Sequence, residues 1–212
     1  MRQATCSPLL EKPPLPTPLS QRLREDTRQA HTAVERQLRL PEAIACREDY
    51  VAFLRRFFSL LRPLEKRLLA FPDWQDHGID VVEHCQAPRL EADLRSLQPG
   101  VLLPPHAPAA ALPCLPGFAQ ALGTLYVLKG SMMGGEVILR HLLAAGIDGV
   151  PAASRFLGAG RAQAGGHWQA FRACLDHYGA AAPEEASMVV AGAEESFRSI
   201  GEWMQSTRWR EM

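Results

Sequence analysis

Residues 122–139 read LGTLYVLKGSMMGGEVIL. Most positions are apolar or small and no proline interrupts the run, which predicts the middle of a long helix over about 117–145. Gly130, Gly134 and Gly135 are unexpected inside such a helix, because each costs roughly 1 kcal/mol relative to alanine. Their combined cost of about 3 kcal/mol must be offset by a contact of this helix.

The spacing of these glycines leaves two explanations open. Gly130 and Gly134 are four residues apart, so they form one smooth face of the helix. Such a face allows another helix to cross closely at small residues. It also allows a broad planar ligand to lie against exposed backbone.

Helical spacing of apolar residues continues on both sides of this run. Together with the absence of alternating strand patterns, it predicts an all-α fold, a compact multi-helix domain of six or seven helices over residues 20–212. Residues 1–19 carry five prolines and are expected to form an extended or disordered tail. The other expected helices cover about 20–40, ending before Pro41, then 48–70, 88–97, 162–178, ending at Gly179, and 183–207, with a proline-rich connection at 99–116.

Composition excludes several classes of protein. Lys plus Arg and Asp plus Glu are both 23, and this zero net charge argues against a general nucleic-acid binder. No apolar run reaches the roughly 18 residues of a membrane span, and no signal peptide is visible, so we expect a cytoplasmic protein. Five cysteines without C-x-x-C spacing argue against a disulfide framework and a zinc knuckle.

His31 is the first candidate ligand. It follows Leu23 by eight residues and Thr27 by four, which predicts a side chain on or beside the apolar face of its helix, towards the core. Glu35, four residues later, is placed to accept one imidazole N–H and leave the other nitrogen for a metal. Arg24 lies about 10 Å before His31 on the same face, within reach of a carboxylate at the rim of a flat ligand. Each of these features has an ordinary alternative. His31 could be a packed core histidine, His31 and Glu35 could form an ordinary surface pair, and Arg24 could be a solvated cation.

Three segments of the chain resemble the haem oxygenases. They are LxxxTxxxHTxxE at 23–35, LYVLKGSMMGG at 125–135 and GHWQAFR at 166–172. The first is similar to the proximal helix of that family and the second to its distal helix. The sequence of these segments most resembles the bacterial branch, especially the enzymes that accompany bacteriophytochromes.

The resemblance implies haem b held between a proximal and a distal helix, as substrate and cofactor. With O2 and electrons from a ferredoxin or flavoprotein reductase, the reaction gives biliverdin, CO and Fe(II), by default at the alpha meso carbon. A bacteriophytochrome would accept the biliverdin. His31 is then the iron ligand, Gly130, Ser131 and Gly134 the catalytic distal residues, and the other haem contacts are Arg24, Thr27, Glu35, Gly135, Arg172 and Arg198.

Two positions bear on this assignment. Ser131 stands where mammalian members carry Asp, as in many bacterial members, and Lys129 stands where many bacterial members carry an acidic residue. Because of Lys129, the resemblance does not determine which polar contacts form around this position. A haem carrier or sensor on the same fold is the first alternative, and a di-iron oxidase or thiamin-pathway hydrolase the second. A di-iron site needs Glu-x-x-His pairs, and the sequence shows none.

Overall fold

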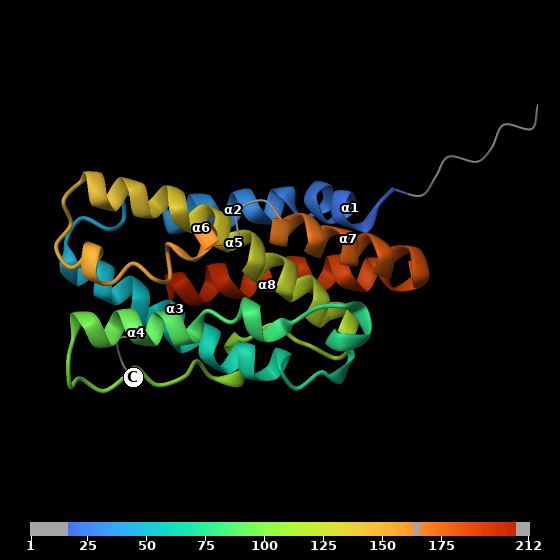
Figure 1. Ribbon diagram of the computed structural model, residues 1–212, viewed down its shortest axis with the longest axis horizontal. Coiled ribbons are helices and arrows are strands. Elements are labelled where there is room, and N and C mark those ends of the chain that lie inside the picture. Colours follow the sequence, from blue (N-terminus) through green and yellow to red (C-terminus); the bar gives the residue numbers. More distant parts are fainter. Residues whose placement is uncertain (1–16, 163–165, 207–212) are drawn as a thin grey trace, which may run out of the picture.

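The computed structural model describes residues 17–162 and 166–206. Within these ranges the regular structure is helical and no strand occurs, which confirms the predicted all-α class (Figure 1). The predicted tail at 1–19 lies almost wholly outside the described residues. The α-helices are α1 (Leu19–Asp26), α2 (Arg28–Leu38), α3 (Arg47–Leu68), α4 (Ala87–Leu97), α5 (Phe118–Ala144), α6 (Ala159–Ala162), α7 (Gly166–Ala181) and α8 (Ala186–Gln205).

Helix α8 is the centre of the molecule. It packs most extensively on α5 and also contacts α2, α1 and α3. In Figure 1 it lies in a middle layer with α7, between α1 and α2 on one side and α3 and α4 on the other. Within the described residues, no helix combines the length and the apolar run needed to cross a membrane.

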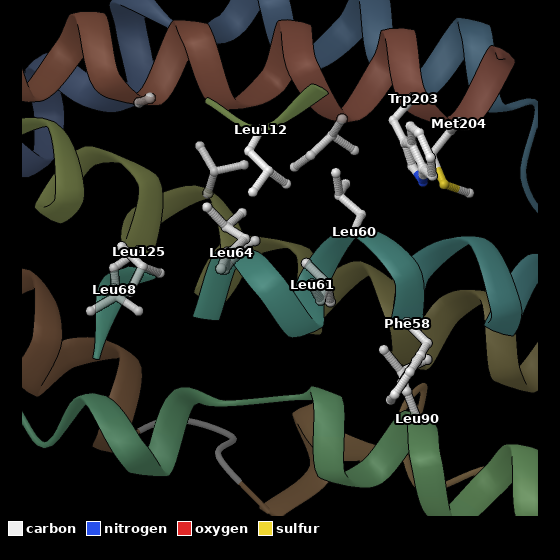
Figure 2. Packing of buried hydrophobic residues seen from close by; sticks show 14 of the residues in the cluster. Phe58, Leu60, Leu61, Leu64, Leu68, Leu90, Leu112, Leu125, Trp203 and Met204 are labelled. Carbon is white, nitrogen blue, oxygen red and sulfur yellow. The ribbon is translucent and has the colours of Figure 1, made fainter. Parts of the chain in front are cut away.

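Helix α3 supplies much of the hydrophobic core (Figure 2). Leu60 lies towards Trp203 of α8, and Phe58 lies towards Leu90 of α4. All four side chains are buried. Because a fully buried leucine contributes roughly 1.5–3 kcal/mol, α3 stabilises the packing of α4 and α8 together.

The crossing of α5 and α8 depends on glycine. A Cβ atom on Gly123 would overlap the carbonyl oxygen of Val189, and one on Gly192 would lie 2.5 Å from the carbonyl oxygen of Gln120. The two helix backbones therefore approach closely at small residues. Close helix packing of α5 thus occurs at Gly123, whereas the sequence interpretation had considered it at Gly130 and Gly134.

Two expected helix boundaries were wrong. The helix predicted over 20–40 is divided at Thr27 into α1 and α2, and Thr27, with a ψ of −1°, departs from regular helix geometry. Its hydroxyl donates to the carbonyl oxygen of Leu23 at 2.6 Å. Gly179 does not end α7, which continues to Ala181. A Cβ on Gly179 would lie 2.7 Å from that of Leu19, so this glycine permits α7 to cross α1.

The remaining boundaries are close to those predicted, including α3 with Pro63 inside it. Gly146, with a φ of +69°, follows α5 as expected. The predicted start of α7 at Ala162 falls at the end of short α6, and residues 163–165 lie outside the described ranges.

Candidate functional site

One face of α5 is left open by the rest of the described chain. Gly130, Met133, Gly134 and Val137 share this face because they follow helical spacing. A Cβ atom added to either glycine would meet nothing within 4 Å. Met133 is 57% exposed and Val137 is 56% exposed, although both are apolar. We call these four residues the distal face.

Gly135 points away from the distal face. Its Cβ atom would lie 2.9 Å from the carbonyl oxygen of Leu157, so this glycine permits a loop to pack against α5. Asp93 of α4 holds that loop, because its carboxylate accepts the backbone N–H groups of Arg155 and Phe156 at 3.1 and 2.8 Å. Gly135 therefore supports α5 from behind, and its expected place beside the ligand is corrected.

His31 lies on α2 and its side chain is 55% exposed, so the expectation that it faces the core was wrong. Helix α2 has no buried residue, and it packs mainly on α8. The His31 ring lies 5.3 Å from the Phe197 ring, centroid to centroid. Its Nε2 atom lies 3.6 Å from Oε1 of Glu35, so the predicted pair is present. A proton on the nitrogen that faces Glu35 leaves the other lone pair available to a metal ion.

Helices α2 and α5 both pack on α8 and make at most marginal contact with each other. His31 and the distal face therefore belong to two helices that both pack on α8. A separate hollow of about 620 Å³, lined in part by Leu38, Phe53 and Met204, lies at the C-terminal ends of α2 and α8 and does not include His31.

Arg24, Thr27, Tyr126 and Arg172 come together from α1, α5 and α7. Burial raises the pKa of the Tyr126 hydroxyl, and the positive charges of Arg172 and Arg24 and a hydrogen bond with the Thr27 side chain oppose that shift. Arg24 is exposed and makes no ion pair within residues 17–162 and 166–206. Arg172 lies 3.5 Å from the hydroxyl of Ser20. This group is a cationic corner with a phenol at its centre, beside the first turn of α2.

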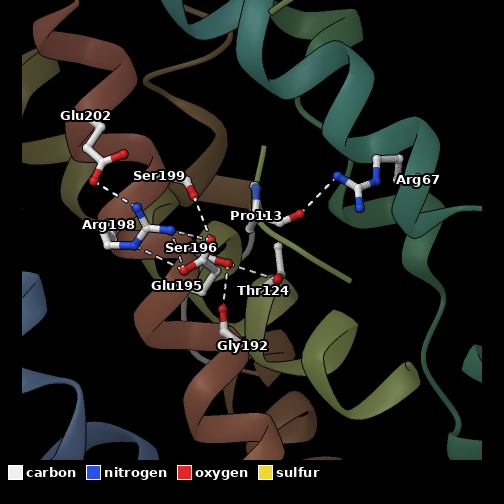
Figure 3. A network of polar contacts seen from close by, with 9 residues as sticks. All are labelled: Arg67, Pro113, Thr124, Gly192, Glu195, Ser196, Arg198, Ser199 and Glu202. Carbon is white, nitrogen blue, oxygen red and sulfur yellow. Dashed lines mark hydrogen bonds and ion pairs between the residues drawn. The ribbon is translucent and has the colours of Figure 1, made fainter. Parts of the chain in front are cut away.

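Arg198, the third expected cation, is engaged elsewhere. Its guanidinium donates to Glu195 at 2.6 Å and to Glu202 at 2.8 Å (Figure 3). These carboxylates raise the pKa of Arg198 above its usual range. Among the described residues no contact joins Arg198 to the cationic corner, so the prediction for this residue has no geometric support.

The two hydroxyl residues of the predicted site are bonded to their own helices. Thr27 is buried and donates to Leu23, and its carbonyl oxygen accepts the backbone N–H of His31 at 2.9 Å. Ser131 is exposed and donates to the carbonyl oxygen of Leu128 at 2.7 Å. The Ser131 oxygen keeps a lone pair for a further donor such as water.

The sequence interpretation missed three residues of this region. They are Tyr126, Met133 and Val137. Spacing alone would have placed Met133 and Val137 on the face of Gly130, at three and seven residues beyond it. Their exposure was not predictable, because it depends on which helices cover α5.

The fold and this open region define a helical protein with the haem oxygenase fold. Residues 117–206 match the family model described as heme oxygenase. The structure is similar to that of the heme oxygenase from Neisseria meningitidis, solved with NO and CO bound, with a TM-score of 0.72 and 22% identity over 90% of this chain and 92% of that chain. No curated protein is significantly similar in sequence.

The matched segment and the similar fold support the resemblance to the haem oxygenases predicted from the sequence. The matched segment contains α5 and the distal face. It does not contain His31, whose assignment stays a prediction.

Proposed function

We propose that the chain is a haem oxygenase that binds haem as its substrate between α2 and the distal face of α5. With O2 and electrons from an external donor, it would open the porphyrin at a meso carbon to give biliverdin, CO and Fe(II). The observation that carries the proposal is the distal face, where two glycines and two exposed apolar side chains leave room for a flat apolar body. This face lies in the segment that matches the family.

The described residues fit haem by their chemistry. An imidazole such as His31 is a proximal haem ligand, and Glu35 is placed to fix its orientation. Met133 and Val137 would cover apolar porphyrin surface that otherwise faces water. Arg24, beside Tyr126, would pair with a propionate at the rim, because a guanidinium recognises a carboxylate by parallel hydrogen bonds.

The remaining roles follow from position. The bare backbone at Gly130 and Gly134 would let bound O2 lie close to α5 and would direct it to one porphyrin edge. Ser131 would hold a water molecule that supplies protons, since its oxygen still accepts. Thr27 would orient Tyr126, and Arg172 would add charge to the same corner.

The finer parts of the proposal rest on the sequence resemblance. They are the alpha meso carbon, a ferredoxin or flavoprotein reductase as donor and a bacteriophytochrome as acceptor of biliverdin. Cysteines without paired spacing favour a reducing compartment, so we propose a cytoplasmic reaction.

Hemin titration followed by reductant in air tests the function. We expect a stoichiometric complex that converts to a green bilin with release of CO. His31→Ala should abolish turnover, and His106→Ala, which removes an exposed histidine from the connection between α4 and α5, should leave turnover unchanged. A complex whose Soret band persists under reductant would favour the carrier alternative. Normal turnover by His31→Ala would refute the ligand assignment.

The di-iron alternative loses support from the structure. Within the described part of the chain, no three His, Cys, Asp or Glu side chains gather in a way that could hold a metal ion. A di-iron centre needs several carboxylate and histidine ligands from facing helices.

A further inference from the structure

Lys129 directly precedes Gly130 and is only 3% exposed. Its ammonium lies 3.3 Å from Nδ1 of His84, which ends a short turn (Val81–His84) and is itself buried. The same ammonium lies 5.3 Å from the centre of the Phe171 ring of α7. One side chain of α5 therefore joins two segments that are distant in sequence.

The ammonium carries the charge in this contact. Burial, and after it the nearby charge of Lys129, lower the pKa of His84 to about 4. Burial also lowers the pKa of Lys129, which Glu83 and Cys174 oppose. Asp80 and His167 are the other titratable groups that act on His84. Near neutral pH the imidazole is thus uncharged and accepts from the ammonium on Nδ1, while the Phe171 ring adds a cation–π contact.

Helix geometry links the direction of Lys129 to the direction of the distal face. Successive residues of a helix are turned by about 100°, so an inward Lys129 places Gly130 and Gly134 towards the open side. Met132 contacts the same segment, because its sulfur accepts a hydrogen bond from Nε2 of Gln86 at 3.2 Å. This bond supports the same rotation of α5 about its axis. The segment around His84 and Gln86 therefore holds two residues of α5 directly behind the distal face.

We propose that Lys129, through its contact with His84 and Phe171, is a positioning residue that fixes the rotation of α5 and hence the distance of the Gly130 and Gly134 backbone from the substrate. This inference rests on the proposed haem oxygenase function. Glycines make α5 less stiff at this point. The rotation of the helix therefore depends on Lys129 and Met132, which contact other segments on the side opposite the distal face. A displacement of about 1 Å is enough to change rate and product in a reaction controlled by orientation.

The test compares Lys129→Met, which keeps the length and removes the charge, with Lys129→Arg, which keeps the charge. For Lys129→Met we expect kcat to fall at least about tenfold and the biliverdin to become a mixture of isomers, with haem affinity nearly unchanged. Lys129→Arg should restore a single dominant isomer. His84→Phe, which keeps the aromatic packing and removes the acceptor, should give the same mixture, and the double variant should be no worse than either single one.

Thr124→Val is the matched control, because it removes a buried hydrogen bond between α5 and Ser196 of α8 at 2.8 Å. It should lower the melting temperature without changing the isomer ratio. A Lys129→Met protein that is equally destabilised, yet keeps the wild-type isomer and turnover per bound haem, would overturn the inference. If Lys129→Met does not fold, His84→Phe decides in the same way. Wild-type protein that binds haem without opening it would refute the proposed function instead, and the inference with it.

Discussion

Gly134→Ala should raise the stability of the haem-free protein and lower the turnover of hemin. Alanine is favoured over glycine in a helix interior because it loses less backbone entropy on folding. At most buried glycines this gain is cancelled by a clash. At Gly134 the new methyl group would meet nothing within 4 Å, so the gain should appear in full.

The expected magnitude is about 1 kcal/mol in the free energy of unfolding. For a chain of this size that corresponds to a rise in melting temperature of about 2–4 °C. The measurement is thermal or urea unfolding of haem-free protein, followed by circular dichroism at the helix band.

The same methyl group would occupy the space that the substrate needs. We expect turnover of hemin to fall at least about tenfold or the product isomer to change, because the porphyrin is pushed away from the backbone. Absorbance titration and chromatographic separation of the bilin isomers measure the two effects. The variant therefore separates stability from function in opposite directions.

Gly123→Ala is the control on the same helix. Its methyl group would overlap the carbonyl oxygen of Val189 in the crossing of α5 with α8. We expect a loss of about 3 kcal/mol, as for overpacked sites. If Gly134→Ala were destabilising as well, or if it left both turnover and isomer unchanged, the open distal face would not be the substrate site.

Two further results should follow from the charges. Arg24→Ala should weaken haem binding about fivefold with little change in stability. Arg198→Ala should leave haem affinity unchanged, because Glu195 and Glu202 already engage that guanidinium. Equal effects of the two variants in an absorbance titration would contradict this distinction. Between pH 6.5 and 4 the free energy of unfolding should fall by up to about 3 kcal/mol on account of His84, because the unfolded chain takes up the proton first when the folded pKa is about 4 instead of 6.5; His84→Phe should remove this part of the pH dependence in urea titrations, and an identical slope would refute it.

The sequence by itself determined the helices and one of the two faces of the site. Apolar spacing gave α3, α4 and α5 nearly to the residue, because helix formation depends on local contacts three and four residues apart. The contact of His31 with Glu35 is local in the same way and was correctly expected. Gly130 and Gly134 were recognised as unusual from their cost alone.

Only the tertiary structure decided which use each glycine has. Gly123 and Gly135 lie against backbone of other segments, and Gly130 and Gly134 lie against open space. The difference depends on where α8 and the loop of Leu157 pass, and no local pattern encodes that position. Contacts between residues far apart in the chain also turned His31 outward and buried Lys129 beside His84. Helical propensity is thus set by neighbours in sequence, whereas exposure is set by which remote segment covers each face.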